Sequence, residues 1–114
     1  MRTGIMTTLL LLSSLLTGHD YQDAAAAADD GSQVAIVTPK NGQVIAGGDV
    51  DVQFKLVKGN QAYHAHVFLD GQYQTAFHSP LMGLKPGPHE IKVIAATADH
   101  RLLKAADAVR FEVR

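Results

Sequence analysis

The chain has 114 residues, with ten Lys plus Arg, eleven Asp plus Glu and no Cys. This length allows one domain, and the missing thiols exclude disulfides, thiol catalysis and Cys-type zinc sites. Nine basic and nine acidic residues remain after the first 28 positions, without a basic run, so the sequence has no electrostatic footprint for nucleic acid.

The first 28 residues have the three parts of a secretory signal peptide. Arg2 gives a positive start, residues 5–16 form a short apolar run, and the alanines at 24–28 offer a cleavage site after Ala26 or Ala28. A membrane anchor or a buried helix is the alternative, but the run is too short for a permanent span. We therefore expect a periplasmic or secreted protein.

After a polar leader at 29–33, residues 34–114 show short alternating runs separated by turn signals. Residues 98–106 are ambiguous, and a helical turn with Leu102 and Leu103 tucked under it is the expectation there. Such spacing predicts an all-β antiparallel sandwich of six to seven strands. The expected strands are 34–37, 49–57, the two arms of a hairpin at 63–78, 89–97 and 107–114, and the segments 44–46 and 81–84 are candidates for a further short strand.

Two segments carry a family resemblance. The run from Thr38-Pro39-Lys40-Asn41-Gly42-Gln43-Val44 to Asp49-Val50-Asp51-Val52-Gln53-Phe54, and the turn Leu84-Lys85-Pro86-Gly87-Pro88-His89 into a strand, are similar to exported bacterial immunoglobulin-like (fibronectin III-like) domains. The His-x-His strand, Pro-Gly-x-His and the late Asp99-His100 resemble small uncharacterised periplasmic families of this type. The resemblance covers 34–114 and implies an immunoglobulin-like sandwich, a fold that hosts many unrelated functions.

The central stretch, 63–78, is two alternating runs joined by Asp70-Gly71, a strong hairpin signal. A two-residue loop would place Tyr73 on the face of the histidines, whereas a three-residue loop with Gly71 as a bulge would separate apolar residues from polar ones. Because a one-residue slip moves every side chain to the other face, the more segregated pattern favours the three-residue loop. That register places His78 opposite or diagonal to His64.

The histidines suggest a metal site. His64 and His66 project from one face of a strand, and the sandwich topology brings His78 and His100 toward the same end. Imidazole ligands suit copper or zinc. Met82 would add a soft ligand for copper(I), and Asp99 a further ligand or an acceptor that orients an imidazole. These four histidines, His64, His66, His78 and His100, are the predicted metal ligands.

The alternative is that these are scattered surface histidines without a shared function, since their spacing matches no short metal-binding sequence motif. A structural or protein-interaction module using the 63–78 hairpin face or a sheet edge is the competing function, and it requires an exposed Phe68. His89 is expected at the opposite end, buried and donating to a turn carbonyl. No nucleophile motif or paired carboxylates support an enzyme.

Overall fold

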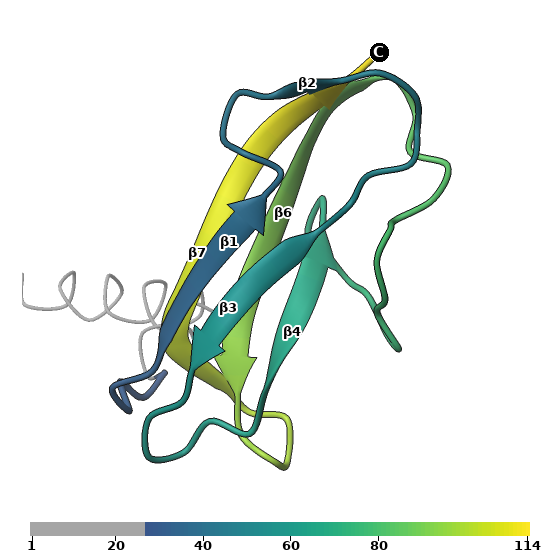
Figure 1. The fold of residues 1–114 in the computed structure, drawn as a ribbon. Coiled ribbons are helices and arrows are strands. Elements are labelled where there is room, and N and C mark those ends of the chain that lie inside the picture. Colours follow the sequence, from purple (N-terminus) through teal and green to yellow (C-terminus); the bar gives the residue numbers. More distant parts are fainter. Residues whose placement is uncertain (1–26) are drawn as a thin grey trace, which may run out of the picture.

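The computed structural model describes residues 27–114, which form a β-sandwich of seven strands in two sheets (Figure 1). One sheet is the antiparallel pair β1–β3, and the other has the order β2-β7-β6-β4-β5. The predicted all-β sandwich is therefore confirmed, whereas the expected signal peptide falls almost wholly on residues 1–26, which lie outside the described part. The strands are β1 (Gln33–Thr38), β2 (Val44–Ile45), β3 (Gln53–Val57), β4 (His64–Leu69), β5 (Gln72–Tyr73), β6 (Gly87–Ala96) and β7 (Leu102–Val113).

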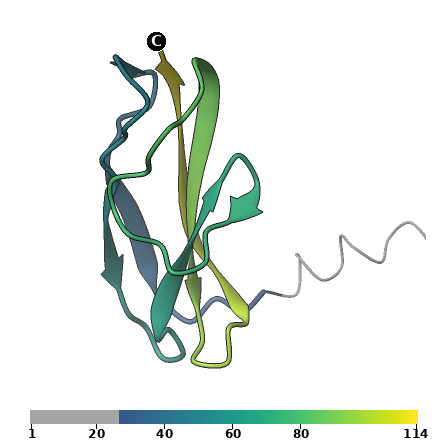
Figure 2. The same cartoon turned by 90° about the vertical axis from the view of Figure 1, so that its right-hand side faces the viewer.

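The apolar core lies between the two layers, which Figure 2 shows nearly edge-on. Alternating apolar residues along the strands form this core, because every second side chain of a strand points to the same face. Asp107, in the middle of β7, also joins the layers, since its Oδ2 accepts a hydrogen bond from the Ile36 N–H of β1 at 2.8 Å. The buried core residues are Val50, Val52, Val67, Leu81, Ile91, Val93, Val109, Phe111 and Val113.

Strands β6 and β7 form the long antiparallel pair at the centre of the larger sheet. β7 begins at Leu102, so the helical turn expected over 98–106 is wrong. Leu103 is buried and Leu102 is 41% exposed, and this alternation continues down the strand. The segment is extended rather than helical because the strand pairs with β6, for example through Leu102 and Ala96. This pairing satisfies backbone groups of β6 that a helical turn would leave without partners.

The β4–β5 hairpin has a two-residue loop, so the predicted three-residue loop is wrong. Leu69 pairs with Gln72 and Phe68 with Tyr73. Asp70 and Gly71 have φ of 50° and 85°, the left-handed pair of a type I′ turn, whose twist matches that of the strands. β5 is only two residues long and both are exposed, so no buried face was present to favour the segregated register.

The remaining irregular segments close the edge of the sandwich. The predicted strand at 49–57 is regular only in its second half, and Val50 instead forms an isolated bridge with Leu81. Leu81 is the one position of the predicted strand 81–84 that is paired in this way. Val50 and Leu81 exchange two backbone hydrogen bonds of 2.8 Å, which fix the loop after β5 against the smaller sheet.

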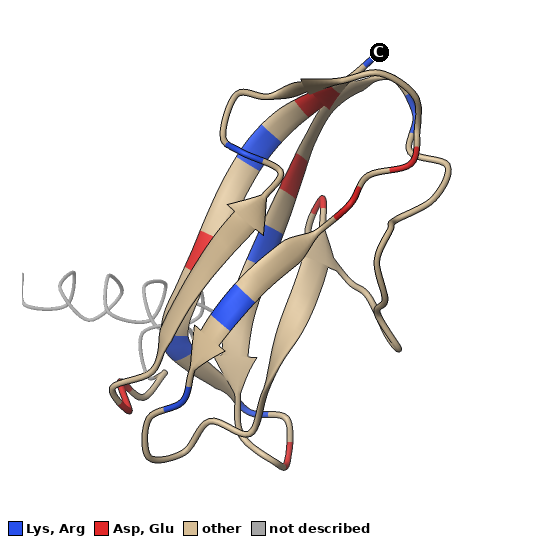
Figure 3. Ribbon diagram, in the orientation of Figure 1, with Lys and Arg blue, Asp and Glu red and all other residues tan. Residues whose placement is uncertain are grey.

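Charged side chains of both signs are distributed along the strands and loops of the described chain (Figure 3). Glu90 and Arg110, for instance, pair across β6 and β7. This distribution agrees with the composition, in which neither charge predominates and no positive surface for binding a polyanion is indicated. Within residues 27–114, no helix has the length and apolar character needed to cross a bilayer.

Candidate metal site

Strand β4 places two histidines side by side. His64 and His66 are two residues apart, so both project from the face of the larger sheet that points away from the core. Their partners on β6 are Ala96 and Ile94. His66 is buried, at 6% exposure, and His64 is half-buried.

The third histidine comes from the turn between β6 and β7. Thr97 organises this turn: its N–H donates to the Arg101 carbonyl, its carbonyl accepts from the His100 N–H, and its hydroxyl oxygen accepts from the Arg101 N–H. The Thr97 hydroxyl in turn donates to the Asp99 carboxylate. His100 has a φ of 69°, a left-handed conformation that is uncommon for residues other than glycine.

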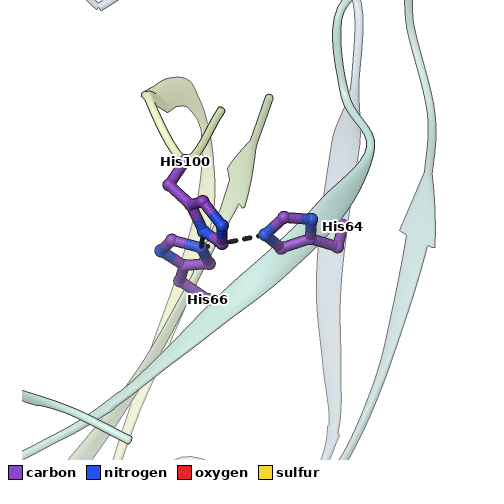
Figure 4. A group of neighbouring side chains, drawn as sticks. All are labelled: His64, His66 and His100. Carbon is purple, nitrogen blue, oxygen red and sulfur yellow. Dashed lines mark hydrogen bonds between the residues drawn. The ribbon is translucent and has the colours of Figure 1, made fainter. Parts of the chain in front are cut away.

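The three imidazoles converge on one point (Figure 4). His66 Nε2 lies 3.0 Å from His64 Nε2 and 3.2 Å from His100 Nδ1, and the three nitrogens all lie within 4.8 Å of one another. Ligands about 2.0–2.1 Å from a tetrahedral zinc ion are about 3.3–3.4 Å apart. The two shorter separations are close to that spacing, so small rotations of the rings would admit an ion.

The surroundings of His66 favour the neutral form of its imidazole. Burial lowers the pKa of His66, and the neighbouring His64 and His100 lower that pKa further. An unprotonated ring is the form that binds a metal, because the ligand nitrogen needs a free lone pair. His66 Nε2 takes part in both short contacts. His66 is therefore the residue whose surroundings most favour the ligand form at neutral pH.

Two tyrosines flank the cluster, and the sequence prediction missed both. The Tyr73 ring lies 4.6 Å from the His66 ring and the Tyr63 ring 5.5 Å from the His64 ring, centre to centre. Tyr73 reaches His66 because the two-residue loop places it on that face of the sheet. The signal was the Asp70-Gly71 pair, whose type I′ preference predicts this register.

His78 is not part of the group. It is exposed, in the loop that follows β5, where it lines a separate depression with Phe77 and Met82. The prediction that it lies opposite or diagonal to His64 is wrong, because β5 ends at Tyr73 and the chain leaves the sheet before residue 78. Met82 accompanies His78 rather than the three converging histidines.

Asp99 is engaged elsewhere. Its carboxylate accepts from the Thr97 hydroxyl and forms a 3.5 Å ion pair with Arg101. The Thr97 hydrogen bond is the main reason why the pKa of Asp99 lies below its usual value. Asp99 therefore shapes the turn that carries His100, and within residues 27–114 it makes no hydrogen bond to an imidazole.

His89 occupies the opposite end, as predicted, and donates from Nε2 to the Lys85 carbonyl at 2.6 Å. Its Nδ1 also lies 2.7 Å from Asp70 Oδ2 at the tip of the β4–β5 hairpin. Its ring stacks on the core residue Phe111 at a centre distance of 5.8 Å. The role of His89 is thus to tie the hairpin tip to the start of β6.

Phe68, on which the interaction-surface alternative depends, is half-buried. It lies directly across from Tyr73, with ring centres 5.6 Å apart. The outer face of the hairpin therefore presents Tyr73, at 45% exposure, more openly than Phe68.

The strand order and packing define a fibronectin III-like β-sandwich. Among solved structures with this arrangement are the fibronectin(III)-like modules of Clostridium thermocellum CbhA, at 17% identity and a TM-score of 0.57, covering 71% of this chain and 94% of that one. A second is an engineered protein, at 16% identity and a TM-score of 0.51, covering 73% of this chain and 20% of that one. At these identities the similarity shows the fold alone. Neither a family model nor a curated protein sequence matches this chain.

Proposed function

We propose that this protein is an exported, non-enzymatic binding domain that holds one transition-metal ion, copper or zinc, through His64, His66 and His100. The observation that carries the proposal is the convergence of three imidazole nitrogens on a shared point, with separations of 3.0 and 3.2 Å around His66. The same nitrogens can hydrogen-bond to one another when no ion is present, and their spacing is close to that of imidazole ligands around one ion, which scattered surface histidines would not show.

The donor set narrows the choice of metal. Three neutral nitrogens suit zinc, copper(II) and nickel, whereas Ca²⁺ and Mg²⁺ require oxygen ligands. His78 and Met82, which would have supplied a fourth nitrogen and a soft sulfur, lie in a different depression. Among residues 27–114 the site therefore has no thioether to select copper(I), and we expect it to bind divalent ions.

The test is a thermal melt of the protein with and without zinc, copper(II) or nickel. An ion that binds the folded state alone stabilises it by about 2.7 kcal/mol at a hundredfold excess over its dissociation constant. We expect this stabilisation in the wild type and in the matched control His78→Ala. It should be absent from His64→Ala/His66→Ala, and a shift of equal size in that double variant would contradict the assignment.

We also propose that the chain is cleaved on export and acts in the periplasm or outside the cell. The pattern of Arg2, the apolar run and the alanines supports this. The Ala28 carbonyl accepts from the Lys104 N–H of β7 at 2.8 Å, so cleavage after Ala26 preserves a contact of the folded domain. The mass of the mature protein should therefore correspond to a chain starting at Ala27, and a start at Asp29 would contradict this choice of site.

A further inference from the structure

We infer that a metal ion held by the three histidines keeps one coordination position open to solvent, and that small monodentate anions bind there. This inference rests on the proposed metal site. It goes beyond that site by specifying the class of external molecule that binds the ion.

The first argument is the number of donors. In the part of the chain that the structure describes, the cluster of metal-ligating side chains around His66 contains three members, and each offers one nitrogen. The adjacent carboxylate, Asp99, is directed to Thr97 and Arg101. Zinc in proteins is usually four-coordinate, and a set of three protein ligands is typical of sites that bind water or another external molecule.

The second argument is the direction in which the site opens. Burial falls steadily across the cluster, from His66 at 6% exposure, through the half-buried His64, to the exposed His100. Tyr73 packs against the His66 ring. The side of the cluster near His100 is therefore the one through which an external ligand reaches the ion.

The third argument is charge. Three neutral imidazoles leave the full double positive charge on a divalent ion, which attracts anions and acidifies a bound water. A cation, Lys58 Nζ, lies 5.6 Å from the centre of the Tyr63 ring, and this ring in turn packs edge-on against His64. Asp99, the acid next to His100 in the chain, already pairs with Arg101 at 3.5 Å, which offsets its repulsion of an incoming anion.

Cobalt(II) provides the experiment, since its visible absorption reports the geometry and identity of its ligands. The full chain is loaded with cobalt(II) and titrated with azide while its visible spectrum and its elution volume are recorded. We expect a saturable change in the visible bands at an unchanged elution volume. The His78→Ala variant should respond in the same way, because His78 is outside the cluster.

The outcomes separate the two proposals. A loaded protein whose bands do not respond to azide would overturn the open position. Cobalt-dependent dimerisation that blocks the response would also overturn it, by showing that a second copy supplies the fourth ligand. The metal site itself is contradicted if the wild type shows no cobalt bands, or if its bands persist in His66→Ala. In either case the inference about the open position fails with it.

Discussion

At the scale of single residues, the state of each histidine follows from its neighbours. His66 is buried between two other imidazoles, so its pKa lies below the usual value and the ring is neutral at pH 7. His89 is the opposite case, because both of its ring nitrogens face acceptors, Asp70 Oδ2 and the Lys85 carbonyl. Only the imidazolium form can donate to both.

The charge of His89 gives the first prediction. The hydrogen bond to the Lys85 carbonyl, followed by that to Asp70, raises the pKa of His89 above 6.5. The resulting stabilisation is fully present below the unfolded value of 6.5 and is lost as the pH rises through the raised pKa. A titration of the ring signals by NMR should show this raised pKa, and Asp70→Asn should lower it.

The same substitution has an effect on stability. Because Asp70 is 45% exposed, we expect Asp70→Asn to cost about 1 kcal/mol near pH 6, less than a buried charged hydrogen bond. The difference from the wild type, measured by urea unfolding, should shrink as the pH rises above the His89 pKa. A His89 pKa at or below 6.5 would contradict this account.

At the scale of elements, two turns position the metal ligands. The turn at residues 97–101 presents His100 in a left-handed conformation that glycine adopts more easily. A histidine at this position therefore carries a backbone cost of about 1 kcal/mol. Strained residues of this kind are concentrated at functional sites.

This cost predicts that stability and binding separate at His100. His100→Gly should be as stable as the wild type, or more stable by up to about 1 kcal/mol, while losing the stabilisation by metal. His100→Ala is the matched control, since it removes the ligand and keeps the strain. Thermal melts with and without zinc check both effects, and a full zinc shift in His100→Gly would remove His100 from the site.

The second turn precedes His64 and is held by the buried carboxylate of Asp30. Its oxygens accept from the Ser32 N–H and hydroxyl and from the N–H groups of Gln61 and Ala62, at 2.8–3.0 Å. Desolvation alone would raise the pKa of Asp30, but these hydrogen bonds outweigh it and lower the pKa to about 2. Asp30 thereby connects the start of the domain to the loop that leads into β4.

We expect Asp30→Ala to lower the thermal midpoint at pH 7 substantially. Asp29→Ala is the control, because Asp29 makes one exposed hydrogen bond, to the Gly31 N–H. Since the folded pKa is lowered, the contribution of Asp30 is present above 3.8 and is lost as the pH falls toward 2. Equal midpoints for the two variants at pH 7 would contradict the role of Asp30.

At the scale of the whole molecule, the sandwich is held together by its apolar core without disulfides. Ile91 is fully buried at the centre of β6. Ile91→Ala should cost about 3 kcal/mol in urea unfolding, from lost burial and the cavity left behind. Val57→Ala, at a position 58% exposed, should change stability by less than about 0.5 kcal/mol, and equal costs would contradict this core.

Much of this architecture was predictable, because alternation along β6 and the end of β7 directly encodes which faces are buried. The hairpin register was not predictable from alternation, since β5 is too short to bury a face. The type I′ turn at Asp70 and Gly71 determines the register instead. Convergence of His64, His66 and His100 followed from the strand period and the sandwich topology. The position of His78 depended on how far β5 extends, which local alternation did not determine.

The most direct test of the central claim is an NMR measurement of the imidazole ¹⁵N shifts on titration with zinc, because coordinated, protonated and free ring nitrogens have different shifts. The geometry predicts coordination through Nε2 of His64 and His66 and Nδ1 of His100, at one zinc per chain. The rings of His78 and His89 should keep their zinc-free shifts. Unchanged shifts for the three clustered rings, or coordination by His78 in place of His100, would contradict the account.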